Sequence, residues 1–304
     1  MIYNGIIPLI GNTPLIRLER FSARVGAKRA ILGKAERFNP CGSAKDRPAL
    51  FMLEEGIKQG KIDSDSVIIE ATSGNTGIAL AAICACKGLE CVIVMPENMS
   101  AERQRLISLY GARIVLTPAS EGMIGAAKKA ESLAKEYKKA FIPDQFSNPA
   151  NPLSHYATTA GEIWNACEGK IAAVVIGVGS GGSISGIARS LKERDSGIRV
   201  FAVEPLGSAV LSGQPAGSHG IQGIGAGYIP KNYDQSLVDG VIAVSDGDAL
   251  EYASLLAKTE GLLCGISSGA ALYGAREVSL DETIGDGEIV ALLPDTGERY
   301  LSVF

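Results

Sequence analysis

The stretch NPCGSAKDRPAL, residues 39–50, places one lysine, Lys45, just ahead of Pro48. Proline has no backbone N–H and is tolerated in the first turn of a helix, so a helix is predicted to begin close to Lys45, with Ser43 or Asp46 as its cap. A helix N-terminus and partial burial both favour the neutral form of a lysine amine. A neutral amine attacks carbonyl carbons, so Lys45 is a candidate nucleophile, although it could also be an ordinary solvated lysine.

Two further loops are rich in groups that bind anions. ATSGNTG, residues 71–77, offers hydroxyls, an amide and backbone N–H groups at a predicted helix start, which suits a carboxylate; the plainer alternative is an ordinary helix cap. GVGSGGS, residues 177–183, adds the hydroxyls of Ser180 and Ser183 to backbone N–H groups, which suits a phosphate monoester. Both loops are predicted to connect a strand end to a helix start, where α/β proteins bind ligands.

A fourth loop, GISSGAA at residues 265–271, is predicted to occupy the same kind of position. One of its two serines, Ser267 or Ser268, is expected to cap the helix, and the other is then free to meet a ligand. A reactive lysine, a phosphate loop and a carboxylate site together fit pyridoxal phosphate, which has an aldehyde, a phosphate and amino-acid substrates. We therefore predict that these loops form one composite site.

The loop at 177–183 also supports a different class of protein. Gly177, Gly179 and Gly182 have the spacing of a dinucleotide fingerprint, and Glu204 lies at the end of the next predicted strand, where a ribose ligand is expected. This leaves an NAD(P)-binding oxidoreductase as an alternative. The serine hydroxyls and the otherwise unexplained Lys45 favour the phosphate monoester.

The elements that must position these loops alternate along the chain. Several apolar runs are nearly continuous, which predicts mostly parallel sheets covered on both faces. We expect two α/β domains, with a crossover near residues 146–152. The predicted strands are residues 29–36, 66–71, 91–96, 113–118, 140–145, 172–178, 199–205, 240–245 and 288–294. The predicted helices are residues 48–60, 74–88, 99–111, 121–137, 154–167, 182–195, 245–261 and 267–278.

Composition narrows the class further. The 304 residues carry a formal net charge of −4, which gives no basic footprint for nucleic acid. The apolar runs are too short to span a bilayer, and the N-terminus lacks the pattern of a signal peptide. The six cysteines form no CxxC pair, so no metal site is expected, and a reducing cytoplasm suits them. Cys41, in the loop that holds Lys45, is the exception, and its role is open.

Segments in a fixed order along the whole chain resemble the cysteine synthase family, the O-acetylserine sulfhydrylases. The segments are IGNTPLIRL (10–18), NPCGSAKDR (39–47), EATSGNTGIALA (70–81), FSNPANP (146–152), GVGSGGSISG (177–186), IQGIGAG (221–227), GISSGAA (265–271) and GERYLS (297–302). The resemblance implies the pyridoxal-phosphate fold of the tryptophan synthase β subunit. Cys41 and Ala44 stand where the family usually has glycine and valine, and GSGGS stands where GTGGT is common.

The implied fold has two open, twisted, mostly parallel sheets flanked by helices, with pyridoxal 5′-phosphate in the cleft between two domains. The first domain would span 35–148 together with 1–12, and the second 149–304 together with the crossing segment 13–34. The implied enzyme is a transferase that makes L-cysteine from O-acetyl-L-serine and sulfide by β-replacement, through an aminoacrylate intermediate. Related activities stay open: cystathionine formation, cysteine desulfhydration, serine dehydration, or a cysteine synthase that uses phosphoserine. A homodimer and binding of the C-terminal tail of serine acetyltransferase are also implied.

The resemblance assigns roles residue by residue. Lys45 would bond to the cofactor and then act as the catalytic base, Asn75 would bind the cofactor 3′-oxygen, and Ser267 would face the pyridine nitrogen. The phosphate would be held by Gly179, Ser180, Gly181, Gly182 and Ser183. The substrate would be bound by Thr72, Ser73, Gly74, Thr76 and Gln145, with Met123, Gly223, Gly225 and Ala226 lining the entrance. Of the two histidines, His155 is interpreted as a cap or core-edge residue and His219 as a loop residue.

Overall fold

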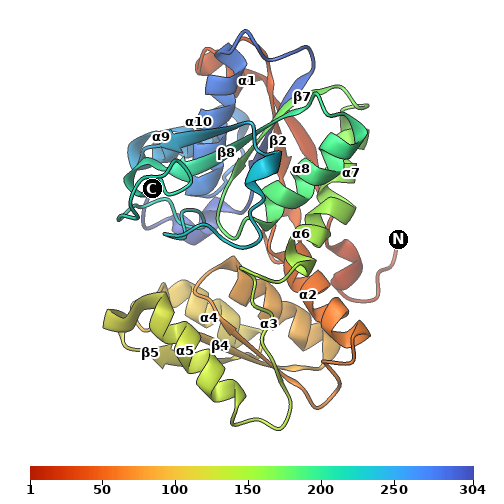
Figure 1. Cartoon of the computed structure of the whole chain (residues 1–304), viewed down its shortest axis with the longest axis vertical. Coiled ribbons are helices and arrows are strands. Elements are labelled where there is room, and N and C mark those ends of the chain that lie inside the picture. Colours follow the sequence, from red (N-terminus) through yellow and green to blue (C-terminus); the bar gives the residue numbers. More distant parts are fainter. The chain divides into compact units, whose positions relative to one another are not determined.

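The computed structural model describes residues 1–304, and the chain divides by its internal contacts into two compact units (Figure 1). The first unit comprises Met1–Ile10 and Lys45–Asn151. The second unit comprises Gly11–Ala44 and Pro152–Phe304. No helix in either unit has the length and apolar character needed to cross a bilayer.

The first unit is built on a four-stranded, wholly parallel sheet with strand order β5–β4–β3–β6. The strands are β3 (Val67–Ala71), β4 (Glu90–Pro96), β5 (Arg113–Thr117) and β6 (Ala140–Phe141). The helices are α2 (Asp46–Lys58), α3 (Asn75–Lys87), α4 (Ala101–Leu109) and α5 (Gly122–Ala134), and α6 (Ala150–Ser154) leads into the second unit. Val67 and Ile69 pack with α5, while Ile93 of β4 faces Gly77 of α3 on the opposite side. Helices therefore cover both faces of this sheet, which explains its nearly continuous apolar strands.

The second unit contains a six-stranded sheet with order β1–β2–β10–β7–β8–β9. Only β1 runs antiparallel to its neighbour, β2. The strands are β1 (Leu15–Leu18), β2 (Ile31–Ala35), β7 (Ile171–Gly177), β8 (Arg199–Pro205), β9 (Gly240–Val244) and β10 (Glu288–Leu293). The helices are α1 (Glu19–Arg24), a π-helical turn at His155–Thr159, α7 (Ala160–Ala166), α8 (Gly182–Arg194), α9 (Asp246–Glu260) and α10 (Ile266–Leu280).

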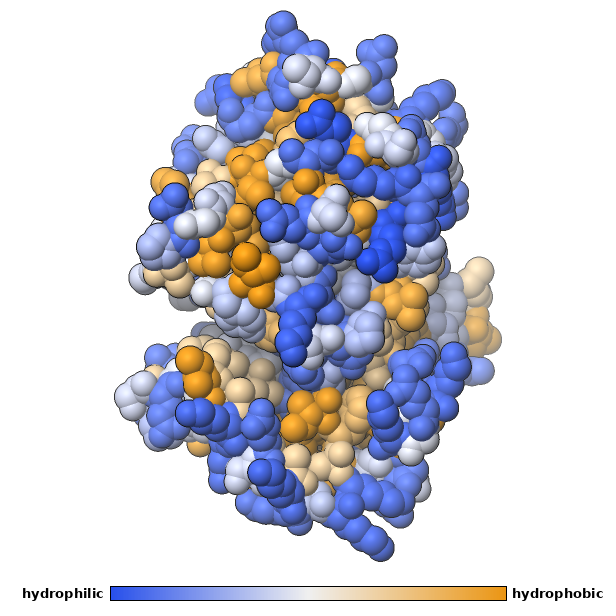
Figure 2. Space-filling model, viewed as in Figure 1, coloured by the Kyte–Doolittle hydropathy of each residue, from blue (hydrophilic) through white to orange (hydrophobic).

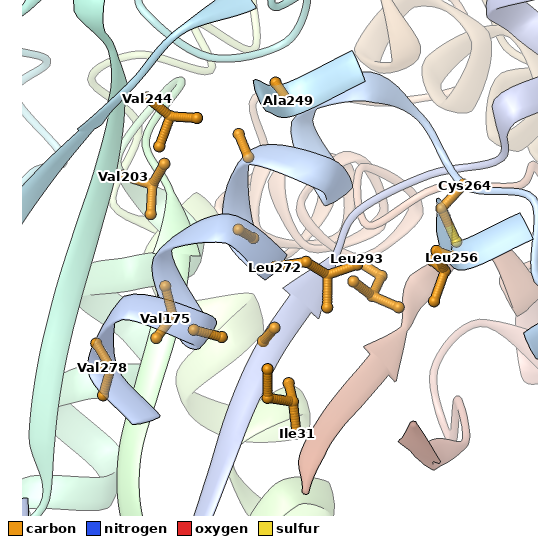
Figure 3. Packing of buried hydrophobic residues seen from close by; sticks show 14 of the residues in the cluster. Ile31, Val175, Val203, Val244, Ala249, Leu256, Cys264, Leu272, Val278 and Leu293 are labelled. Atoms are coloured by element: carbon orange, nitrogen blue, oxygen red, sulfur yellow. The ribbon is translucent and has the colours of Figure 1, made fainter. Parts of the chain in front are cut away.

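Two cores sandwich the second sheet. Figure 2 shows a viewed face that is mainly hydrophilic, with hydrophobic side chains gathered in a few places, while the two cores consist of buried residues. On one face of the sheet, Val175 and Val203 lie against α10, and the same core extends through Leu293 of β10 to Leu256 of α9 (Figure 3). On the other face, alternate strand residues such as Val174 pack against α7 and α8. The two-residue period of each strand sends neighbouring side chains to opposite cores.

The predicted fold class, with two mostly parallel sheets flanked by helices, is confirmed. All the predicted strands and helices are present, although β6 is reduced to two residues. The prediction missed β1, α1 and α6, which have four, six and five residues. Elements this short contain too few residues for a helical or strand periodicity to be recognised in the sequence.

Candidate active site

Lys45 lies at the mouth of a helix, as the sequence predicted. Helix α2 begins at Asp46, and Lys45 is its N-cap residue, with a carbonyl oxygen that accepts the Ala49 N–H at 3.0 Å. The N-cap residue is therefore Lys45 and neither Ser43 nor Asp46, and the Lys45 side chain makes no capping hydrogen bond. Asp46 and Arg47 are buried, while Lys45 is half-buried. Lys45 is therefore partly desolvated at the N-terminus of a helix.

The N-cap residue of α3 is Gly74, which has no side chain, and the Gly74 N–H donates to the Thr72 hydroxyl at 3.4 Å. Thr72 and Thr76 are buried, and Ser73 and Asn75 are half-buried. Backbone N–H groups and hydroxyls at a helix N-terminus suit a carboxylate.

Gln145 is brought to this helix start from a distant part of the chain. The Thr76 hydroxyl donates to Gln145 Oε1 at 2.5 Å, across a separation of 69 residues. Gln145 itself is buried. Four predicted substrate residues, Thr72, Ser73, Thr76 and Gln145, therefore lie in one unit around the start of α3. Met123, by contrast, lies in the first turn of α5 and is 39% exposed.

The predicted phosphate loop in the second unit connects β7 to α8. Its Gly181 is the N-cap residue of α8, with a φ of +81° in the left-handed region and no side-chain cap bond. A Cβ atom on Gly181 would lie 2.6 Å from the Tyr233 nitrogen, and one on Gly179 would lie 2.3 Å from the Gly223 oxygen. Glycine is therefore required at both positions by close packing of backbone.

The same packing brings a second loop against the phosphate loop. The Gly225 N–H donates to the Val178 oxygen at 2.9 Å, so residues 221–227 lie beside residues 177–183. Ser267 also approaches, because a Cβ atom on Gly223 would lie 3.9 Å from its hydroxyl. The structure thus groups the predicted cofactor residues Gly179–Ser183 and Ser267 with the predicted entrance residues Gly223–Ala226.

The loop at 265–271 differs from its prediction in two respects. It follows helix α9 and not a strand, since only an isolated bridge between Cys264 and Thr296 precedes α10. The N-cap residue of α10 is Gly265, and no side chain caps the helix. Ser267 and Ser268 both lie buried in the first turn. The expectation that one of these serines caps the helix is therefore wrong.

His155 is a residue that the sequence analysis misjudged. It lies in the π-helical turn at His155–Thr159, has 0% of its surface exposed, and its Nε2 lies 3.0 Å from the Ser183 Oγ. Its Nδ1 lies 2.9 Å from the Thr159 Oγ1. His155 is thus neither a cap nor a core-edge residue but a direct partner of the phosphate loop. No sequence signal links positions 155 and 183, because tertiary packing alone makes them neighbours.

Glu204 does not fit the ribose role of a dinucleotide site. Its buried carboxylate accepts hydrogen bonds from the Leu211 N–H at 2.7 Å, and from the Ser212 N–H and hydroxyl at 3.0 and 2.5 Å. These bonds occupy both oxygens and fix the loop that follows β8. The glycine spacing at 177–182 therefore serves a strand–helix turn without the acidic partner that the fingerprint requires.

The chemistry of these groups fits pyridoxal phosphate. A phosphate dianion is favoured at the N-terminus of α8, where the buried Ser180 and Ser183 offer hydroxyls beside the backbone N–H groups. An aldehyde requires an amine, and Lys45 of the first unit has one. An amino-acid carboxylate requires donors, and the start of α3 in the same unit has backbone N–H groups and hydroxyls.

Comparison with known proteins agrees with this chemistry. The family described as "Pyridoxal-phosphate dependent enzyme" matches residues 6–295, so the chain belongs to this family. It is 46% identical over 301 residues to a cysteine synthase of Staphylococcus aureus, covering 98% of this chain and 96% of the relative. The enzyme therefore uses pyridoxal 5′-phosphate, as the sequence predicted.

Two solved structures have the same fold over the whole chain. The cysteine synthase of Entamoeba histolytica superposes with a TM-score of 0.96 at 42% identity, covering 100% of this chain and 90% of that one. A hydrogen sulfide-producing enzyme from Fusobacterium nucleatum superposes with a TM-score of 0.94 at 46% identity, covering 99% of both chains. These relatives place the chain among the cysteine synthases and enzymes similar to them.

Proposed function

We propose that this enzyme makes L-cysteine from O-acetyl-L-serine and sulfide. The observation that carries the proposal is the start of α3, which has Gly74 as its N-cap residue and hydroxyls and Gln145 around it, as an amino-acid carboxylate requires. The 46% identity to a cysteine synthase supports the same reaction. Acetate would leave Cβ, sulfide would form the new C–S bond, and the Cα proton would be removed and returned, so no oxidant or reductant is needed.

The residues of the chain would divide this work between them. Bound pyridoxal phosphate supplies an electron-withdrawing ring that makes the Cα proton acidic and allows the β-substituent to leave. Lys45 would take the proton from Cα and return it at the end of the cycle. Thr72, Ser73, Thr76 and Gln145 would hold the substrate carboxylate, and Asn75 would bind the cofactor 3′-oxygen. Gly179–Ser183 would hold the phosphate.

Ser267 would tune the reaction through the pyridine nitrogen. A buried serine hydroxyl, unlike a carboxylate, does not force protonation of that nitrogen. The electron-withdrawing power of the ring is then moderate, which suits loss of a β-substituent more than chemistry that needs a long-lived carbanion. Met123, Gly223, Gly225 and Ala226 would line the entrance near the leaving group.

A second function deserves a direct test. The enzyme from Fusobacterium nucleatum, named for hydrogen sulfide production, is as similar in sequence to this chain as the Staphylococcus aureus cysteine synthase. Cysteine desulfhydration uses the same bond-breaking steps with sulfide as the leaving group. Discrimination between such activities depends on pocket contacts worth about 1–3 kcal/mol each, which the shared fold leaves open.

The decisive experiment follows the absorbance of the purified holoenzyme. O-Acetylserine should change the yellow absorbance, and sulfide should then restore it with release of L-cysteine. A yellow enzyme that ignores O-acetylserine but releases sulfide from L-cysteine would favour the desulfhydrase. A protein that pyridoxal phosphate cannot reconstitute would overturn the proposal. The Lys45→Ala variant tests the role of the lysine in this experiment. Its control is Lys58→Ala, which is changed at the exposed end of α2.

A homodimer, a cytoplasmic location and binding of the serine acetyltransferase C-terminal tail belong to the same proposal. They are supported by the family resemblance and, for the reducing compartment, by six unpaired cysteines, of which only Cys86 is exposed. Light scattering of the purified enzyme tests the dimer. Competition between a peptide with the tail sequence and O-acetylserine tests the partner.

A further inference from the structure

Glu70 is a buried acid in an otherwise apolar strand. It lies near the end of β3, an inner strand of the parallel sheet, and only 3% of its surface is exposed. A buried carboxylate is costly unless hydrogen bonds compensate for the lost water. Here the Asp144 N–H donates to Oε2 at 2.9 Å, and the Gln145 N–H donates to Oε1 at 3.2 Å. Each carboxylate oxygen therefore holds one residue of the segment that follows β6.

Three hydrogen bonds hold Gln145 in place. Glu70 binds its backbone N–H, Asn151 Nδ2 donates to its carbonyl oxygen at 2.7 Å, and Thr76 donates to its side-chain oxygen at 2.5 Å. The preceding residue, Asp144, has a φ of +52°, a conformation that a residue with a side chain rarely adopts. Such a conformation persists when its surroundings hold it in place. Glu70 supplies two of the bonds that do so.

We propose that Glu70 is a positioning residue for the substrate carboxylate, because it fixes Gln145 against the start of α3. This inference rests on the proposed function, in which Gln145 binds that carboxylate. Glu70 does not touch the substrate. Its effect reaches the substrate through the backbone of residues 144 and 145, and it should therefore change affinity more than the rate of the chemical step.

The charge of Glu70 matters because both of its partners are donors. Burial raises the pKa of Glu70 to about 7, helped by the nearby Asp144 carboxylate and opposed by the two N–H bonds. The other titratable group that faces it is the Cys91 thiol of β4, which contacts Cys84 of α3 and whose own pKa is raised far above its usual range. A proton on Glu70 places an O–H donor opposite an N–H donor and removes one bond. Affinity for the substrate carboxylate should therefore fall as the pH falls through about 7.

The test compares the holoenzyme with Glu70→Gln and with the control Glu90→Gln, which makes the same change at the exposed start of β4. The dissociation constant of O-acetylserine is read from the cofactor absorbance between about pH 6 and pH 8.5. At high pH, Glu70→Gln should bind roughly tenfold or more weakly than wild type, because an amide opposes one N–H, with a much smaller change in kcat. The ratio of the Glu70→Gln dissociation constant to the wild-type dissociation constant should become smaller at low pH, where wild-type Glu70 is protonated. The substrate amine titrates in both proteins and cancels in this ratio.

Other outcomes have distinct meanings. Equal affinities at high pH, or a loss confined to kcat, would overturn the role of Glu70. If Glu70→Gln does not fold, the competition of propionate with O-acetylserine is measured on wild type, because propionate has a carboxylate but no amine. A propionate affinity that does not change with pH would overturn the inference. If wild type ignores O-acetylserine, the proposed function fails, and the same titration with L-cysteine tests Glu70 independently.

Discussion

His155 and Ser183 are 28 residues apart in the chain, and their side chains lie 3.0 Å apart, Nε2 to Oγ, with His155 fully buried. The relationship fixes a direction for the hydrogen bonds. A Ser183 hydroxyl that donates to a phosphate must accept from His155 Nε2–H. His155 Nδ1 lies 2.9 Å from the Thr159 Oγ1, which holds the other side of the ring. The imidazole would thereby orient the phosphate loop through Ser183.

This relationship predicts that His155→Leu weakens cofactor binding. Ser183 would lose the donor that orients its hydroxyl, and the dissociation constant of pyridoxal phosphate should rise roughly tenfold. Fluorescence titration of the protein stripped of cofactor measures the constant. The control is Thr158→Val, which removes a hydroxyl in the same turn that donates to the Ser154 oxygen. An unchanged constant in His155→Leu would show that the Ser183 hydroxyl needs no orientation.

Lys45→Ala should remove both the covalently bound yellow cofactor and turnover. The loss of a positioned acid–base group alone costs about 10²–10⁴-fold in rate. Absorbance after reduction of the imine with borohydride, denaturation and dialysis shows whether the cofactor was bonded to the lysine, and cysteine formation measures the rate. Lys58→Ala should retain both, because Lys58 is exposed at the other end of α2. Near-normal turnover by Lys45→Ala would remove Lys45 from the mechanism.

Gly179→Ala should destabilise the second unit and disturb the phosphate loop together. The new methyl carbon would lie 2.3 Å from the Gly223 oxygen, so the two loops must separate at a cost of about 1–3 kcal/mol. Thermal unfolding and cofactor affinity are measured in parallel. Gly285→Ala is the matched control, because no atom lies within 4 Å of its added carbon and its φ is not in the left-handed region. Equal melting temperatures for the two variants would contradict the packing described here.

The buried ion pair of Lys34 and Glu162 should contribute strongly to stability. Lys34 is 1% exposed, its Nζ lies 2.6 Å from Glu162, and it also donates to the Thr13 oxygen at 2.6 Å. Lys34→Met leaves a carboxylate without its cation and should lower the free energy of unfolding by roughly 2–4 kcal/mol. The exposed pair of Lys28 and Glu282 is the comparison, and Lys28→Met should cost at most about 1 kcal/mol. Denaturant unfolding of both variants measures the difference.

The buried acid Glu70 should also make stability depend on pH. Its folded pKa of about 7 lies above the unfolded value of 4.5, so the folded state binds the extra proton between these limits. The stability that Glu70 contributes is complete below the unfolded value and is lost as the pH rises through about 7. As the pH rises from about 4.5 to about 7, the unfolding free energy of wild type should therefore fall relative to that of Glu70→Gln. A difference that does not vary with pH would show that Glu70 stays ionised.

The sequence by itself determined the elements and the chemistry they carry. Strand runs such as residues 91–96 and 172–178 are apolar throughout, so burial on both faces was readable from composition. Pro48 located the start of α2, and therefore the position of Lys45, because proline is tolerated only near a helix N-terminus. The glycines of 177–183 and the motif order indicated the cofactor. These signals are local, and each depends on residues that adjoin in the chain.

Only the tertiary structure decided which distant residues support the site. His155 meets Ser183, Glu70 meets Gln145, and Glu204 turns to residues 211–212, although no spacing rule connects any of these pairs. The absence of side-chain caps on α3 and α10 was equally hidden, because serine and threonine at a helix start have the same sequence signature whether they cap the helix or face a ligand. Side-chain partners are chosen by packing in three dimensions, where burial obliges each polar group to find a bond.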